Sequence, residues 1–229
     1  MIDHAHDLAS VRAATERLLL AVGALDNAAV TEPSRLPGWS RGHVLAHLAR
    51  NADALVNVLQ GRPMYVSGEA RDADIERGAP RPLDAQLADL RESAARFQEA
   101  GDVPADWSRT VELRNGVTDS ASRVPFRRWV EVELHHVDLG IGYELEDLPA
   151  EFTEREIVFL ADRFSGHPGV PPTRVTDGTR AWSTGREAGD GPEVTVTGSP
   201  ADLLGWLAGR RDGSALTVDG GPLPALPPL

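Results

Sequence analysis

Apolar residues recur at three- and four-residue steps along three stretches of the first hundred residues, which is the periodicity of amphipathic helices. The first predicted helix covers residues 3–25. The second begins after Ser40, a residue type that caps helix N-termini, and ends at Gly61, while the third covers residues 82–100. The apolar stripes of these helices contain Leu8, Val11, Leu18 and Val22, then Val44, Leu48, Leu55 and Leu59, and last Leu83, Leu87, Leu90 and Phe97.

A fourth helix is predicted over residues 127–143, RRWVEVELHHVDLGIGY, and it carries many polar groups for a core element. Burying such groups without partners costs several kcal/mol each. A metal, a substrate or a network of ion pairs therefore has to compensate them. The polar residues that alternate with valines and leucines are Glu131, Glu133, His135, His136 and Asp138.

Two segments between the helices carry turn signals. Residues 61–81 contain three glycines, two prolines and many charges, which predicts a surface loop that could reach toward a site. Residues 107–120 alternate in polarity around Asn115 and Gly116, which predicts a short hairpin before the fourth helix.

Four helices joined by moderate loops predict a four-helix bundle over residues 1–150. The pattern then changes to a helix over 153–164, strand-like pieces separated by turns, and a capped helix over 199–211. Residues 151–229 are therefore predicted to form a small α+β domain that ends in a proline-rich tail, and the fold class is α+β. The predicted strands are 173–177, 180–184, 193–198 and 215–220.

Composition narrows the function. The 229 residues are 41% apolar, which suffices for ordinary cores, and the net charge of −12 disfavours nucleic acid as a partner. No apolar run reaches the roughly 18 to 20 residues that span a bilayer, and the acidic start MIDHAHD lacks the features of a secretory signal. A cytoplasmic protein without a membrane partner is predicted, with a monomer favoured.

Cysteine and lysine are both missing from the sequence. Because the chain has zero cysteines, disulfides, cysteine-ligated zinc and an intrinsic thiol nucleophile are excluded. All 23 basic residues are arginine, so lysine Schiff-base chemistry is excluded as well. Any sulfur chemistry here needs a thiol from outside.

Glu131 and His135 are four residues apart, so on a helix they lie on one face and can hold the same ion. His136 points about 100° away from His135, so one of the two histidines at most shares the target of Glu131. The spacing favours His135. The alternative is a hydrogen bond between Glu131 and His135 on a solvated helix face.

A third ligand has to come from another helix. His47 lies between Val44 and Leu48 at the core margin of the second helix, whereas His43 lies in the first turn near solvent. His47 could also be a structural histidine. Together with Glu131 and His135, however, it forms a set of two histidines and one glutamate that leaves coordination positions open, as catalytic zinc sites do.

Several arginines are candidates for holding a carboxylate. Arg210 and Arg211 close the predicted helix of the second domain, where they could simply favour the helix dipole. The alternative is that one of them holds a carboxylate through two hydrogen bonds. Arg127 and Arg128, one turn before Glu131, could do the same or pair with acidic neighbours.

Three segments, LPGWSRGHVLAHLARNADAL, RWVEVELHHVDLGIGY and GSPADLLGWLAGR, together resemble the mycothiol-dependent maleylpyruvate isomerase family of DinB-like metalloenzymes. The resemblance implies a DinB-like helical bundle that holds a divalent metal, usually zinc, through His47, Glu131 and His135. It implies that Arg210 and Asp138 are catalytic residues, with Arg210 binding mycothiol or the substrate carboxylates and Asp138 in a supporting role behind the ligands.

The resemblance also implies a reaction in which zinc lowers the pKa of the mycothiol sulfhydryl and the thiolate adds to the cis double bond of maleylpyruvate. Charge builds on the ketone oxygen, the new single bond rotates, and loss of the thiolate gives fumarylpyruvate. The expected partners are a small-molecule thiol and a small carboxylate. Mycothiol belongs to actinobacteria, which agrees with the missing cysteine. Alternatives are a mycothiol S-transferase, a non-catalytic metal-binding module and a metal-dependent hydrolase.

Overall fold

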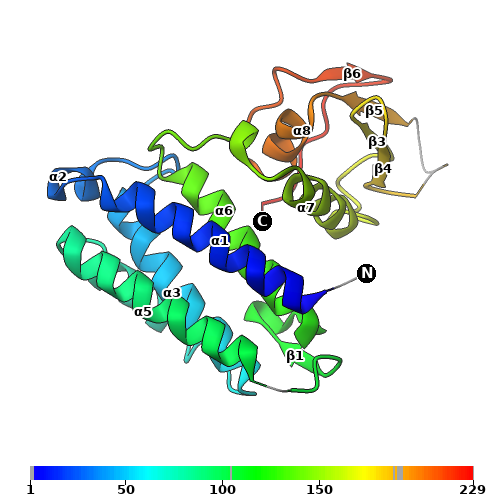
Figure 1. Cartoon of the computed structure of the whole chain (residues 1–229). Coiled ribbons are helices and arrows are strands. Elements are labelled where there is room, and N and C mark those ends of the chain that lie inside the picture. Colours follow the sequence, from blue (N-terminus) through cyan, green and yellow to red (C-terminus); the bar gives the residue numbers. More distant parts are fainter. Residues whose placement is uncertain (1–2, 104, 188, 190–192, 229) are drawn as a thin grey trace. The chain divides into compact units, whose positions relative to one another are not determined.

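Four long helices make up most of the first part of the chain, as the apolar periodicity predicts (Figure 1). The computed structural model describes residues 3–103, 105–187, 189 and 193–228, and the chain divides into two units, Met1–Tyr143 and Glu144–Leu229. The change in sequence pattern had placed this division near residue 150. The long helices are α1 (His4–Gly23), α3 (Arg41–Leu59), α5 (Leu83–Asp102) and α6 (Val124–Asp138).

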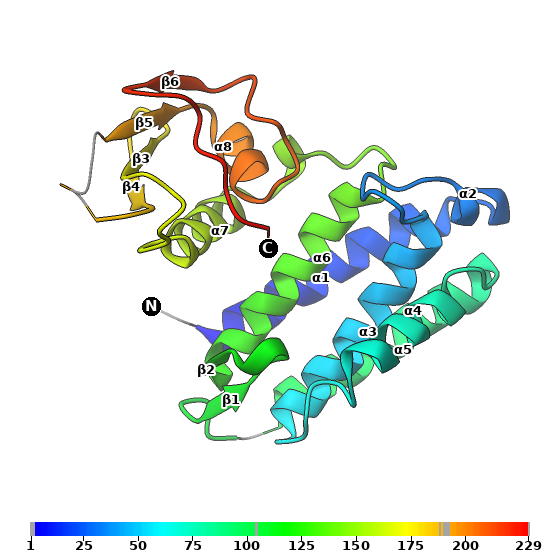
Figure 2. The same ribbon diagram turned by 180° about the vertical axis from the view of Figure 1, so that it is seen from behind.

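Helix α3 is the central helix of the first unit and packs against α5, α6 and a further helix, α4 (Gly68–Gly78) (Figure 2). Helix α4 lies in the segment 61–81 that the sequence had assigned to a loop, and that prediction was wrong here. Ser67 caps α4, but Ile75 is the one buried residue of this helix. The sequence therefore has no apolar stripe from which the helix could be predicted. A short helix, α2 (Asn27–Thr31), was also not predicted.

Helix α6 starts earlier and ends earlier than predicted. It begins at Val124 with Pro125 in its first turn, where a proline is tolerated, and Gly140 follows its end with a φ of 63°. The carbonyl groups at this end are bound by the segment before α3. The backbone N–H of Arg35 donates to Asp138 O at 2.7 Å, and Nε of Arg41 donates to Leu139 O at 2.8 Å.

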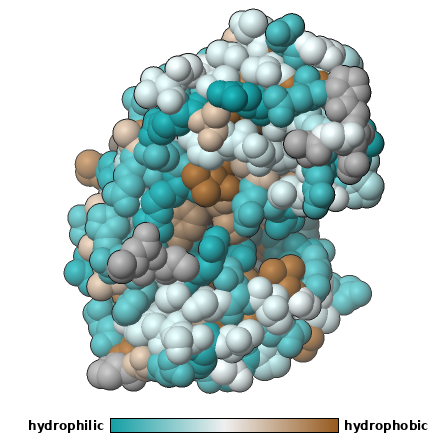
Figure 3. Space-filling view, turned by 90° about the vertical axis from the view of Figure 1, so that its right-hand side faces the viewer, coloured by the Kyte–Doolittle hydropathy of each residue, from teal (hydrophilic) through white to brown (hydrophobic). Residues whose placement is uncertain are grey.

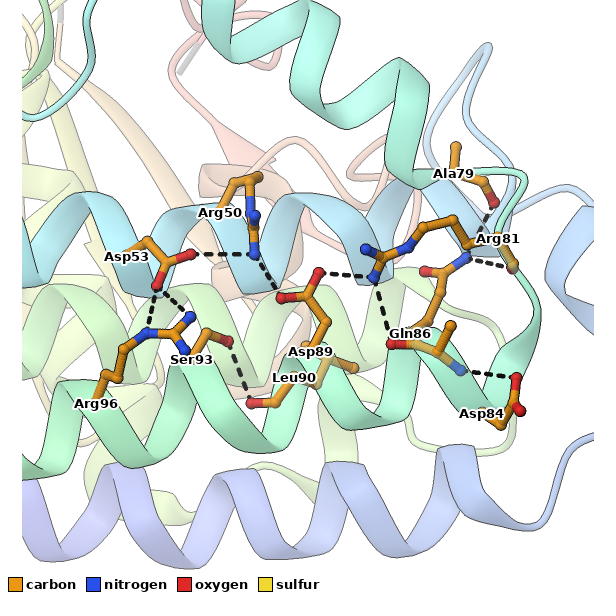
Figure 4. A network of polar contacts seen from close by, with 11 residues as sticks. Arg50, Asp53, Ala79, Arg81, Asp84, Gln86, Asp89, Leu90, Ser93 and Arg96 are labelled. Carbon is orange, nitrogen blue, oxygen red and sulfur yellow. Dashed lines mark hydrogen bonds and ion pairs between the residues drawn. The ribbon is translucent and has the colours of Figure 1, made fainter.

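A web of ion pairs joins α3 to α5 on the bundle surface (Figure 4). Arg50 on α3 binds Asp53 at 3.0 Å and Asp89 of α5 at 2.6 Å, and Asp53 in turn binds Arg96 of α5 at 2.6 Å. Arg81 binds Asp89 at 2.7 Å. Exposed pairs of this kind contribute only about 0–1 kcal/mol each, so the buried apolar stripes supply most of the packing energy. The ion pairs mainly fix the position of α5 along α3.

A predicted hairpin is confirmed before α6. Its antiparallel strands are β1 (Thr110–Glu112) and β2 (Thr118–Ser120). They are joined through Asn115 and Gly116, which both have positive φ as the sequence pair suggests. Two 3₁₀ turns cover Arg114–Gly116 and Ala121–Arg123.

The second unit contains a four-stranded sheet with the order β4-β3-β5-β6, in which β3 and β5 are parallel and the other pairs are antiparallel. Helix α7 precedes the sheet, and α8 connects β5 to β6, as predicted. The α+β fold class is confirmed, and residues 220–228 contain no helix or strand. The elements are a 3₁₀ turn at Leu145–Asp147, α7 (Ala150–Arg163), β3 (Thr173–Thr176), β4 (Ala181–Thr184), β5 (Val194–Thr197), α8 (Pro200–Leu207) and β6 (Thr217–Asp219).

The face of the molecule drawn in Figure 3 is mostly hydrophilic or intermediate, with separate smaller hydrophobic areas. None of the helices in the described residues combines the length and the apolar character that crossing a membrane requires.

Gly42 is expected to be essential for the contact between α3 and α4. A Cβ at this position would lie 2.1 Å from Ala79 O and 2.8 Å from Val30 Cγ1, and the backbone oxygen cannot move aside cheaply. We expect Gly42→Ala to lower the free energy of unfolding by about 1–3 kcal/mol, measured by urea denaturation. Gly23→Ala is the matched control because its Cβ meets nothing within 4 Å. Equal stability of the two variants would contradict the steric explanation.

Candidate metal centre

Three side chains from α3 and α6 converge on one point in the first unit. His47 Nε2 lies 2.9 Å from Glu131 Oε2, and His135 Nε2 lies 3.3 Å from the same oxygen. One ligand atom from each residue lies within 4.8 Å of the others. The two imidazole rings meet edge to face, with centroids 4.6 Å apart. The structure therefore brings together the three residues that the sequence predicts as metal ligands.

The donor set fits a divalent metal such as zinc. Zinc binds imidazole nitrogen and carboxylate oxygen at about 2.0–2.2 Å, so tetrahedral ligand atoms lie roughly 3.4 Å apart. The two histidine nitrogens lie 2.9 and 3.3 Å from Glu131 Oε2, which is close to this spacing. The exposed fraction is 7% for His47, 13% for His135 and 31% for Glu131. A cation held by the three would therefore be enclosed on the histidine side and reachable from the Glu131 side.

Asp138 lies behind His135 and orients its ring. The buried carboxylate of Asp138 accepts a hydrogen bond of 2.8 Å from His135 Nδ1, which leaves Nε2 of His135 to face Glu131. A carboxylate in this position fixes the tautomer of a ligating histidine and raises its basicity. Asp138 thus lies behind His135 and not among the atoms that face Glu131, and the role that the family resemblance implies for it stays a prediction.

The three groups influence one another's protonation. Burial, opposed by the hydrogen bond to Glu131, lowers the pKa of His47 to about 4. Burial alone would raise the pKa of Glu131, but hydrogen bonds from His135 and His47 hold it well below its usual range. For His135, burial is outweighed by the hydrogen bonds to Asp138 and Glu131, so its pKa is raised. Protons therefore compete with a cation mainly at His135.

Arg128 fixes the relative position of the two helices that carry these ligands. Its fully buried side chain comes from α6, and Nη1 donates to Leu48 O at 2.9 Å and to Asn51 Oδ1 at 2.8 Å, both on α3. Burial lowers the pKa of Arg128 to about 10, so the guanidinium stays charged at neutral pH. Leu48 adjoins His47 and Arg128 lies one turn before Glu131, so this contact sets the spacing between the two ligands.

The other polar groups of α6 belong to a second network. Buried Glu133 accepts hydrogen bonds from Arg17 at 2.5 Å, Trp129 Nε1 at 2.9 Å and Tyr143 Oη at 2.8 Å. The His136 ring stacks on Tyr143 with centroids 4.1 Å apart. His136 thus points away from the cluster, as the helical spacing predicts.

Two family profiles cover nearly the whole chain. Residues 11–140 match the mycothiol maleylpyruvate isomerase N-terminal domain, and residues 147–228 match the C-terminal domain named with the abbreviation MDMPI. The first match alone covers more than half of the chain. The protein belongs to the mycothiol maleylpyruvate isomerase family.

Solved structures agree with this family. A crystal structure of the mycothiol-dependent maleylpyruvate isomerase is 29% identical, with a TM-score of 0.87, over 99% of this chain and 97% of that chain. A histidine-to-alanine mutant of a mycothiol-dependent maleylpyruvate isomerase is 28% identical, with a TM-score of 0.89 and the same coverage. No match is found among curated proteins.

Two residues of this family member that the sequence did not single out lie next to the cluster. Nη2 of Arg71, on α4, is 3.2 Å from His47 Nδ1, and the guanidinium lies 5.9 Å from the centre of the Tyr65 ring. Both residues belong to the segment that had been assigned to a loop reaching toward a site. The sequence indicated that this segment could reach toward a site. It did not identify these two residues, because neither shows a spacing that marks it as functional.

The remaining candidates have different surroundings. His43 accepts the backbone N–H of Ser40 at Nδ1 and completes a capping box at the start of α3. Arg210, in the second unit, donates from Nη1 to Ala208 O at 2.7 Å, and its predicted role in binding mycothiol or a carboxylate stays a prediction. Its neighbour Arg211 has a structural role, since it pairs with Asp202 at 2.6 Å and Glu146 at 2.7 Å.

Replacing a metal ligand is expected to abolish metal binding. We predict about one zinc ion per chain in the wild-type protein and strong loss in His47→Ala and in His135→Ala, because each removes one of three protein ligands. Metal content after zinc loading and gel filtration, measured by mass spectrometry, checks this. His43→Gln is the matched control, since glutamine preserves the capping box and the variant should keep its metal. Full metal content in both alanine variants would rule out the ligand set.

Proposed function

We propose that the protein is a zinc enzyme that uses mycothiol to isomerise maleylpyruvate to fumarylpyruvate, or that it catalyses a closely related reaction. The observation that carries this proposal is the cluster of His47, Glu131 and His135 within a chain that matches both domains of the family. A zinc ion held by three protein ligands keeps an open position and supplies Lewis acidity that lowers the pKa of a thiol.

The residues around the cluster suit this chemistry. His47 and Glu131 are held at hydrogen-bonding distance by the buried contact of Arg128 with α3, so little rearrangement is needed to bind a cation. Asp138 keeps the ligand nitrogen of His135 facing inward. Because the chain contains zero cysteines, the reacting sulfur has to come from a small-molecule thiol.

We assign Arg210 to binding mycothiol or a substrate carboxylate. The support is its position after the WL-x-G segment at the end of α8, which the family resemblance connects with this role. Its chemistry also fits, since a guanidinium binds a carboxylate through two hydrogen bonds. Its neighbour Arg211 instead pairs with Asp202 and Glu146.

Maleylpyruvate turnover with and without mycothiol tests the proposed function. We expect the zinc-loaded protein to convert maleylpyruvate to fumarylpyruvate only when mycothiol is added, with mycothiol recovered unchanged. The His47→Ala variant should show no activity, because the cation is lost. Consumption of mycothiol into a stable conjugate would instead identify an S-transferase. An absence of turnover at saturating thiol would contradict the proposal.

Arg210 and Arg211 form a natural pair for a second test. We expect Arg210→Gln to raise KM for mycothiol or for the substrate by about 10- to 100-fold, the usual effect of losing a charged hydrogen bond, with nearly unchanged unfolding free energy. Arg211→Gln should lower stability by about 1 kcal/mol and leave KM unchanged, because its ion pairs are partly exposed. Steady-state kinetics and urea denaturation distinguish the two. The assignment fails if Arg210→Gln leaves both KM values unchanged.

A further inference from the structure

A pocket of about 650 Å³ lies in the first unit. Its walls come from residues 61–68, between α3 and α4, and from residues 109–116 of the hairpin. Tyr65 belongs to the wall, and Arg71 lies over the Tyr65 ring while also contacting His47. These two side chains therefore connect the pocket to the ligand cluster.

The pocket concentrates positive charge in a protein whose net charge is −12. Its lining contains Arg62, Arg109 and Arg114 against a single carboxylate, Glu112. Within the described residues none of the three arginines forms an ion pair. Arg109 donates to the backbone carbonyls of Asp106 and Leu59. A concave site lined by one sign of charge raises the local concentration of ligands of the opposite sign.

Arg71 lies outside the pocket lining and contacts the ligand histidine His47, at 3.2 Å from its Nδ1. Its ion-pair partner is Asp72, at 2.7 Å, whose side chain is 63% exposed. The Arg71 side chain is itself only 12% exposed, but the Asp72 carboxylate is open to solvent and can leave the guanidinium to a ligand carboxylate. Its second contact, to His47 Nδ1, requires a lone pair on that nitrogen, because a guanidinium only donates.

The contact with His47 depends on which imidazole nitrogen carries the proton. If Nε2 of His47 holds a cation, the proton lies on Nδ1, and Nδ1 can no longer accept from Arg71. Nη2 of Arg71 then needs another acceptor. A ligand oxygen in the adjoining pocket would supply it.

We propose that Arg71 binds a carboxylate of the substrate beside the metal, with the arginines of the pocket attracting the anion and contacting its far end. This inference rests on the proposed function, since it assumes a small dicarboxylate that reacts next to His47. It assigns recognition of the anion to α4 and to the hairpin of the first unit, in addition to any contribution from Arg210.

Calorimetric titration with maleate, a four-carbon cis-dicarboxylate, tests the inference on the full-length zinc-loaded protein. We expect Arg71→Gln to weaken maleate binding about 10- to 100-fold, because a two-point charged hydrogen bond is lost. Arg71→Lys should recover part of the affinity. Arg77→Gln is the matched control, because Arg77 lies on the same helix and pairs with Asp74, and its substitution removes the same charge. Its affinity should stay within about twofold of wild type.

Zinc content is measured for every variant, since Arg71 contacts a ligand. Unchanged maleate affinity in a zinc-replete Arg71→Gln protein overturns the inference, as does an equal loss in Arg77→Gln. If Arg71→Gln loses zinc, Arg114→Gln decides: a loss of about threefold or more with intact zinc supports the anion pocket, and no loss overturns it.

The result is separable from the proposed function. Arg71-dependent maleate binding by a protein that does not isomerise maleylpyruvate would refute the reaction and leave the anion site standing. Normal isomerisation with an unchanged KM in Arg71→Gln would refute the anion site alone.

Discussion

The contact between the Arg128 guanidinium and α3 is the constraint on which the site depends. Burying a charge is costly, and here two oxygen acceptors on α3, Leu48 O and Asn51 Oδ1, accept hydrogen bonds from the guanidinium and compensate this cost. The acceptors sit at fixed points of α3, so α6 cannot slide along it without leaving the charge unsatisfied. His47 and Glu131 lie within one turn of this contact and meet as a result.

The polar residues of α6 are explained by two separate networks on one helix. Glu131, His135 and Asp138 serve the cluster, whereas Glu133 ties α6 to Arg17 of α1 through a short ion pair. The sequence raised the question of how a core helix tolerates such groups. The predicted network of ion pairs is present at Glu133, which also accepts hydrogen bonds from Trp129 and Tyr143, and the predicted metal would be held at the other group of side chains.

The sequence predicted those parts of the site that follow from helical period. Glu131, His135 and Asp138 share a face at steps of four and three, and the spacing alone separated His135 from His136. Contacts between different helices were harder to predict from the sequence. Arg127 and Arg128 looked equivalent in sequence, yet Arg127 pairs with Asp119 in the hairpin while Arg128 is buried against α3, about eighty residues away. Arg71 was missed because α4 buries little and shows no apolar period.

The tie between the segment before α3 and the last carbonyls of α6, made by Arg35 and Arg41, fastens one end of this helix pair. The pocket opens at the other end of α3, where residues 61–68 and the hairpin are attached by their own short connections. The proposed metal ligands and the proposed anion pocket thus belong to different segments of the chain. Relatives could exchange the loop and hairpin to accept new electrophiles while inheriting the ion-holding framework intact.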